Sequence, residues 1–173
     1  MNYVHEYDSP LGRIIMESDG RGLTCLRFED GQASAGALTG AAGCTRPHVF
    51  DEAERWLDIY FSGREPGFIP RLSICSTVFR QTVWDILLTI PYGRTKTYGE
   101  IADRIAERMH IPRMSAQAVG GAAGHNPVAL IIPCHRVVGS DGSLTGYAGG
   151  IGRKAKLLEL EKAGVMHRLT EFR

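Results

Sequence analysis

The sequence predicts an α/β fold, with a small N-terminal α/β domain followed by a mostly helical C-terminal domain that contains a helix-turn-helix. Two observations lead to this prediction. In residues 1–30, the side chains alternate along short segments separated by turn residues, as in β-strands. In the second half, apolar residues recur at helical spacing instead. A chain of 173 residues, 43% apolar and 23% charged, fits one or two small domains and can bury a core. We predict domains over residues 1–75 and 76–173.

The N-terminal domain is predicted to consist of short strands and one helix. Turn residues at Ser9–Gly12 and at Asp19-Gly20 separate the first strands. Residues 31–45, rich in Gly, Ala and Ser, indicate a loop. Apolar side chains at helical spacing, with acidic residues at the start, then predict a helix over residues 51–61. The strands are expected over residues 3–7, 13–18, 23–28 and 72–75. Nothing in this half suggests chemistry.

The C-terminal domain is predicted to begin and end with helices. An apolar stripe indicates the first helix, which Ser76 or Thr77 would cap and Pro91 would stop. The stripe consists of Phe79, Val83, Ile86, Leu87 and Ile90. The last helix is expected over residues 153–163, with Gly164 as its end.

Two short helices in the middle of this domain are typical of a helix-turn-helix. The first is expected over residues 98–109, because Thr97 and Glu100 form a capping-box pattern at its start. The second starts after Ser115 and runs to about residue 123. The turn Ser140–Ser143 further along suits the wing of a winged helix.

The second of these helices is built almost entirely of small residues, in the order Ala116-Gln117-Ala118-Val119-Gly120-Gly121-Ala122-Ala123. Glycine inside a helix costs about 1 kcal/mol relative to alanine, so two in a row are expected where another surface must come close. A helix that reads base sequence needs Arg, Asn, Gln or Lys, and this one offers only Gln117. Either it binds DNA through shape and backbone, or it packs against another helix.

A cysteine stands beside a histidine in the segment Asn126-Pro127-Val128-Ala129-Leu130-Ile131-Ile132-Pro133-Cys134-His135-Arg136. Residues 128–132 are expected to form a buried strand closed by Pro133. A rigidly held cysteine with a base as its neighbour is how a reactive thiolate is made. Cys134 is therefore the candidate nucleophile. Cys25 and Cys75 are expected to be core residues, and Cys44 to lie in the Gly/Ala-rich loop.

The two halves of the chain differ in net charge. Residues 1–75 carry 7 basic and 11 acidic side chains, a net −4, whereas residues 76–173 carry 13 and 8, a net +5. The positive half suggests a polyanion as partner, although chance scatter of surface charge is an alternative. No short metal-ligand pair occurs, and no apolar run approaches the length of a membrane span. A cytoplasmic location without metal, cofactor or membrane contact is expected.

The C-terminal half resembles the O6-alkylguanine-DNA alkyltransferases. The resemblance spans about residues 76 to 165. It lies in the Pro-Cys-His-Arg motif at residues 133–136 and in six further motifs. These are Ile90-Pro91-Tyr92-Gly93, Thr97-Tyr98-Gly99-Glu100-Ile101-Ala102, Ala118-Val119-Gly120-Gly121-Ala122, Asn126-Pro127-Val128, Gly146-Tyr147-Ala148-Gly149-Gly150 and residues 154–161. It implies a ribonuclease H-like N-terminal domain and a winged helix-turn-helix domain.

The resemblance implies a single, irreversible transfer of an alkyl group from O6 of guanine, and from O4 of thymine, to Cys134. It gives His135 the role of base through a bridging water, with Glu161 orienting the imidazole. Asn126 would support the cysteine site. The flipped base would contact Tyr98, Val137, Tyr147 and Ala148. No cofactor is required.

Double-stranded DNA carrying O6-alkylguanine, bound by a monomer without sequence specificity, is the partner that the resemblance implies. The expected DNA contacts are Thr97, Tyr98, Ser115, Gln117, Ala118, Gly121 and Arg136, although Arg136 could instead be an ion-pair partner. Gln117 stands where the family usually has an arginine that fills the vacated base stack, which predicts weaker or slower flipping.

Three other functions remain open at this point. The first is a lesion-binding alkyltransferase-like protein with weak or no transfer, against which the presence of Cys134 argues. The second is a winged-helix transcription factor with an inert cysteine, and the third is a cysteine hydrolase.

Overall fold

The computed structural model describes residues 2–29 and 46–171, with side chains described up to residue 166. The chain folds into two compact units. The first comprises Met1–Cys75 together with Pro127–Ala129, and the second Ser76–Asn126 together with Leu130–Arg173. The segment Pro127–Ala129 therefore belongs with the first unit, although it lies within the residues expected for the second domain. The predicted loop at residues 31–45, which includes Cys44, is outside the described residues.

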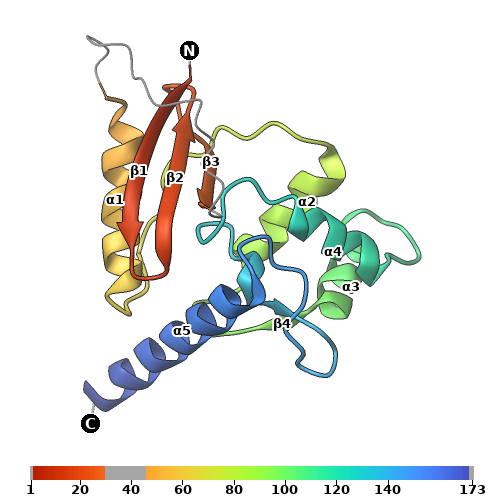
Figure 1. Ribbon diagram of the computed structural model, residues 1–173. Helices are drawn as coiled ribbons and strands as arrows, with labels where there is room; N and C mark the ends of the chain where they lie inside the picture. The colour runs from red at the N-terminus through yellow and green to blue at the C-terminus, as the bar shows by residue number, and fades with distance from the viewer. Residues whose placement is uncertain (1, 30–45, 172–173) are drawn as a thin grey trace. The chain divides into compact units, whose positions relative to one another are not determined.

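The N-terminal unit contains an antiparallel sheet in the order β1 (Tyr3–Ser9), β2 (Gly12–Ser18) and β3 (Leu23–Phe28). Helix α1 (His48–Phe61) lies alongside this sheet (Figure 1). Ser9 pairs with Gly12 across the first turn, and the φ of 113° at Gly12 lies in the region that favours glycine. Buried apolar residues of β2, β3 and α1 form the core: Ile14, Met16, Leu26, Phe50, Ala53, Leu57 and Tyr60.

Three predictions for this unit were wrong in detail. Helix α1 begins at His48 rather than at residue 51, because the buried residues Val49 and Phe50 continue its apolar face. The expected strand over residues 72–75 is a single bridge between Leu72 and Leu23. Beyond that bridge Cys75 is exposed, and Cys25 on β3 is only partly buried, so neither is a core cysteine.

Three helices form the body of the second unit: α2 (Val78–Leu88), α3 (Tyr98–Arg108) and α4 (Ala116–Gly124). Thr77 caps α2, and both halves of the predicted capping box at the start of α3 are present. Helix α4 packs on both others, and the buried Trp84 indole N–H donates to the Ala122 carbonyl at 3.0 Å. The predicted pair of short helices is therefore confirmed, and α3 and α4 lie side by side (Figure 1).

The end of the chain departs from its prediction. Helix α5 (Ile151–Glu171) continues past Gly164, which is buried in it. The next residue, Val165, packs so closely on Gly93 that a Cβ there would collide with it. We attribute the longer helix to this packing, which outweighs the low helix propensity of glycine.

The predicted wing is present only as a turn. Gly139 N–H donates to the Ser143 carbonyl at 2.9 Å, but in the described residues no strand follows this turn. Strand β5 (Val137–Val138) instead pairs in parallel with β4 (Lys96–Thr97). This pairing places the residues just after the cysteine motif beside the start of α3. No described helix combines the length and the apolar character needed to cross a membrane.

Candidate active site

Cys134 begins a short 3₁₀ turn, η1 (Cys134–Arg136), and not the end of a strand. The predicted strand over residues 128–132 is wrong, because only Val128 forms a bridge, to Leu26, and the residues after it turn. Leu130 takes a positive φ of 69°, which breaks an extended chain. The turn holds Cys134 in place through two backbone bonds, from its own N–H to Ile132 at 2.8 Å and from the Val137 N–H to its carbonyl.

The Cys134 thiol lies in the interior of the second unit with 4% of its surface exposed. The Asn126 side-chain amide donates to the Ile132 carbonyl at 2.7 Å and to the Cys134 sulfur at 3.2 Å. Asn126 therefore ties the segment after α4 to the cysteine turn. A donor aimed at sulfur favours its anionic form.

His135 and Arg136 both point to the carboxylate of Glu161 on α5. His135 Nε2 lies 2.7 Å from Glu161 Oε1, and Arg136 Nε donates to Oε2 at 2.9 Å. The Gly93 N–H also donates to Oε2, at 2.9 Å, while Arg136 donates to the Ile90 carbonyl at 2.7 Å. Glu161 is fully buried, so this carboxylate joins the cysteine turn, α5 and the turn after α2.

The surroundings of Glu161 keep it ionised. Burial raises the pKa of this carboxyl, but the hydrogen bonds and charges of His135 and Arg136 outweigh burial and lower it to about 2. An ionised Glu161 accepts from His135, so the imidazole proton is assigned to Nε2 and Nδ1 carries the lone pair. His135 is thereby oriented as a base.

Burial favours the neutral forms of both Cys134 and His135. Burial raises the pKa of the Cys134 thiol, against the opposing effects of the Asn126 hydrogen bond and the Lys154 charge. Burial likewise lowers the pKa of His135, although Glu161 opposes this. A thiol and a neutral imidazole are the forms needed when the proton is to leave sulfur during the reaction.

The candidate base-binding residues Tyr98, Val137, Tyr147 and Ala148 all belong to the second unit. The Tyr98 hydroxyl donates to the Thr145 carbonyl at 3.0 Å. Tyr147 is buried, with its ring edge-on to His135 at 6.3 Å between centroids. The Val137 carbonyl accepts from Lys154, and Ala148 is exposed.

Arg136 requires a correction. It was expected among the DNA contacts, but only 8% of its surface is exposed and its guanidinium is bound to Glu161 and Ile90. The alternative interpretation, an ion-pair partner, agrees with its position. Its charge acts inside the unit and is not presented on the surface.

Helix α4 has two different faces. Val119, Ala122 and Ala123 are buried against the neighbouring helices, whereas Gln117, Ala118 and Gly121 are not. A Cβ on Gly121 would meet nothing within 4 Å, so packing within the protein does not require glycine there. Small residues at this exposed face leave room for another molecule.

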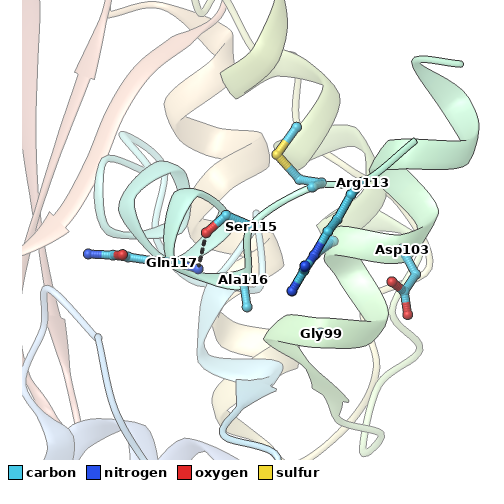
Figure 2. Close-up of a pocket in the computed structure, with 8 residues that line it drawn as sticks. Gly99, Asp103, Arg113, Ser115, Ala116 and Gln117 are labelled. Carbon is cyan, nitrogen blue, oxygen red and sulfur yellow. Dashed lines mark hydrogen bonds between the residues drawn. The ribbon is translucent and has the colours of Figure 1, made fainter. Parts of the chain in front are cut away.

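Two pockets flank the start of α4. One of about 530 Å³ lies against α3 and includes Asp103, Arg113 and Ser115. Figure 2 shows the Ser115 hydroxyl bonded to the Gln117 N–H, with the Gln117 side chain extending away from Arg113. The other pocket, about 610 Å³, includes Gln117, Gly121 and Tyr98. Gln117 and Tyr98, far apart in sequence, thus line one hollow.

Sequence reasoning placed Lys154 in a segment that resembles the family but gave it no role at the site. Its side chain is fully buried, and its ammonium donates to the Val137 carbonyl at 2.5 Å and to the Thr145 carbonyl at 2.7 Å. One signal was present in the sequence, because Lys154 lies seven residues before Glu161 and three before Leu157, on the same helical face.

Comparison with known proteins shows the family. The model described as "6-O-methylguanine DNA methyltransferase, DNA binding domain" matches residues 78–163, and the one for its ribonuclease-like domain matches residues 2–72. The methylated-DNA–protein-cysteine methyltransferase of Mycobacterium leprae is 44% identical over 172 residues, which cover 99% of both chains. The protein of that name from Methanosarcina acetivorans is 41% identical over 92% of this chain and 97% of its own.

Solved structures agree with these matches. The crystal structure of the Mycobacterium tuberculosis O6-methylguanine methyltransferase covers 100% of both chains at 44% identity, with a TM-score of 0.80. The structure of Mycobacterium tuberculosis OGT in complex with DNA covers 93% of both at 44% identity, with a TM-score of 0.76. The mixed α/β fold class is thereby confirmed, and this chain belongs to the 6-O-methylguanine DNA methyltransferase family.

Proposed function

We propose that this protein repairs DNA by transferring an alkyl group from O6 of guanine, or O4 of thymine, to Cys134 in one irreversible turnover. The observation that carries the proposal is the buried Cys134 thiol, held by Asn126 and adjacent in sequence to a His135 that is bonded to an ionised Glu161. The names of the full-length relatives and the family match support it.

The reaction is an in-line displacement at the alkyl carbon. The thiol proton passes through a water to His135, whose charge Glu161 offsets, and the Cys134 sulfur bonds to the carbon. The bond from that carbon to O6 breaks, and its electron pair stays on guanine, which takes up a proton. The Tyr98 hydroxyl and the Ala148 N–H stabilise the developing charge on the base. The product thioether has no easy leaving group, so the protein is spent.

DNA is bound as a duplex, by one protein molecule and without sequence specificity. The exposed face of α4, with Ala118 and Gly121, approaches the minor groove, and Thr97 and Ser115 contact the backbone. The target nucleotide must leave the stack, because its O6 substituent cannot be reached in line inside a duplex. Gln117 fills the vacated space, next to the hollow that Tyr98 also lines.

Mass spectrometry tests the transfer. Mixed with a duplex that carries one O6-methylguanine, the protein should gain one methylene on the peptide that contains Cys134, and the gain should saturate at one per protein. A duplex with unmodified guanine is the control. Tight lesion binding without transfer would favour the lesion-binding alternative, and neither transfer nor binding would refute the proposal.

Replacing Gln117 with arginine should speed repair. Arginine adds a charge and a planar donor group at an exposed position, and one charged hydrogen bond is worth about 1.5 kcal/mol, or roughly tenfold. We expect about that increase in the single-turnover rate or in lesion affinity. The matched control is Gln81→Arg, which adds the same charge at an exposed position of α2. If Gln117→Arg matches the unchanged protein in both measurements, Gln117 does not limit flipping.

A further inference from the structure

The connection between α3 and α4 is longer than a helix-turn-helix needs. Helix α3 ends at Arg108 and α4 begins at Ala116, so residues 109–115 form a seven-residue turn, whereas three or four residues usually suffice. Four residues of this turn are exposed, Arg113 among them. In a helix-turn-helix the first helix crosses the DNA backbone and the second enters a groove. The turn between them therefore lies close to the phosphates.

The start of this turn has a restrained backbone. His110 takes a positive φ of 53°, its N–H donates to the Glu107 carbonyl at 3.2 Å, and the next N–H donates to the carbonyl five residues before it at 3.0 Å. These two bonds form the Schellman pattern that ends a helix. Pro112 follows, and its ring limits the chain directly before Arg113. The turn thus holds the backbone from which the Arg113 side chain extends.

Arg113 is a cation whose charge is not used inside the protein. Within residues 2–29 and 46–166, where side chains are described, no hydrogen bond or salt bridge involves its guanidinium. The two arginines of α3 differ, because Arg104 and Arg108 each donate a hydrogen bond to a side chain of α2 or of its C-cap, at 3.1 and 3.3 Å. The Arg113 guanidinium is therefore available to a ligand.

Arg113 lines the pocket of about 530 Å³ at the start of α4. Among the residues that line this pocket, Arg113 is the one cation and Asp103 the one carboxylate. Figure 2 shows the Arg113 side chain between Asp103 and Ala116, with Gln117 extending to the opposite side. Arg113 does not line the second pocket, which Gln117 shares with Tyr98. It therefore lies next to the exposed start of α4 but outside the pocket expected to take part in flipping.

We propose that Arg113 binds a phosphate of the DNA backbone beside the groove that α4 enters, and so supplies the cation that the exposed face of α4 lacks. That face presents Gln117, Ala118 and Gly121, none of which is charged. An arginine fork matches a phosphate, and a phosphate contact adds affinity without reading sequence. The inference rests on the proposed DNA repair for its partner. It assigns Arg113 to holding the duplex and not to the transfer step.

Pairing of Arg113 with Asp103, as a support for the turn, is the competing explanation. The two explanations predict different effects of Asp103→Asn. A structural partner would be lost, so the protein should become less stable without binding DNA more tightly. A phosphate in the pocket is instead repelled by the Asp103 carboxylate, which also competes for the guanidinium. Under the proposal, Asp103→Asn should therefore tighten duplex binding, by about twofold to threefold.

The salt dependence of duplex binding tests the proposal. Arg113→Gln removes the charge, and Arg108→Gln is the matched control, because it removes an exposed arginine that is already bound to Asp85. Each phosphate contact contributes about 0.9 to the slope of log K against log salt. Arg113→Gln should reduce the slope by about that amount and weaken binding about fivefold in about 0.1 M salt. Arg108→Gln should keep the wild-type slope, and Arg113→Lys should recover most of the loss.

Comparison of lesion and unmodified duplexes separates this role from base flipping. A phosphate contact does not sense the lesion, so Arg113→Gln should weaken both duplexes by the same factor and leave the rate of methyl transfer at saturating protein unchanged. Equal slopes for Arg113→Gln and Arg108→Gln, a loss confined to the O6-methylguanine duplex, or weaker binding by Asp103→Asn would each overturn the inference. A wild-type protein with the Arg113-dependent slope that transfers no methyl group would instead refute the proposed alkyl transfer alone.

Discussion

Replacing Cys134 with serine should abolish alkyl transfer and leave DNA binding intact. A serine hydroxyl is far less acidic than a thiol and a weaker nucleophile, and the His135–Glu161 pair alone cannot attack the alkyl carbon. The substitution exchanges one atom in a side chain that accepts a single 3.2 Å bond from Asn126, so the fold should persist. Transfer of labelled methyl from O6-methylguanine DNA to protein should fall below detection, with lesion affinity within about threefold of wild type.

The control is Cys75→Ser, which changes an exposed thiol in the N-terminal unit and should transfer one methyl per protein as before. Residual transfer by Cys134→Ser at a rate comparable to that of Cys75→Ser would show that another group is the acceptor. Loss of lesion binding together with transfer would show that the thiol also holds the flipped base.

Replacing Glu161 with glutamine should cost both stability and activity. The amide keeps the shape of the carboxylate but leaves Arg136 buried without its counter-ion, and breaking such a pair costs about 3–5 kcal/mol of unfolding free energy. Without the acceptor at 2.7 Å, His135 loses its orientation, and the rate of transfer should fall about a hundredfold. Denaturant unfolding and single-turnover kinetics measure the two effects.

The stability loss should depend on pH in a defined direction. The pKa of Glu161 is about 2 in the fold, against an ordinary value of 4.5 for a free glutamate, so its ionised form stabilises the protein fully above pH 4.5. This contribution disappears as pH falls from 4.5 towards 2, and the gap between wild type and Glu161→Gln should narrow over that window. Glu159→Gln, at an exposed position of the same helix, is the matched control. Equal stabilities of Glu161→Gln and Glu159→Gln at pH 7 would contradict the role of the buried carboxylate.

Local signals predicted most of the secondary structure. The capping box of Thr97 and Glu100 depends only on residues three apart, and the structure has both of its bonds. The spacing of apolar residues likewise located α2. The buried face of a helix produces this spacing within the helix itself, whichever element the helix packs against. The end of α5 was missed for the opposite reason. A glycine such as Gly164 usually ends a helix. Here α5 continues past it, and the next residue, Val165, packs on Gly93, which is distant in sequence.

At the candidate site, too, the sequence predicted one feature and missed another. The motif around Cys134 was evident in the sequence, because a reactive cysteine, its neighbouring histidine and the flanking prolines lie within a few residues. The 3₁₀ turn at Cys134 was not predicted, since the positive φ of Leu130 has no marker in a run of apolar residues that otherwise favours a strand.

By itself, the sequence determined the first three strands, the order of the helices, the helix-turn-helix, the family and the cysteine motif, because each depends on neighbouring residues or on a linear pattern. Only the tertiary structure decided that Arg136 is buried against Glu161 and that Lys154 lies at the cysteine turn. Both are cations that a linear reading assigns to the surface. The acceptors that bind these two cations lie 9 to 46 residues away in the sequence, and only the folded chain brings them together.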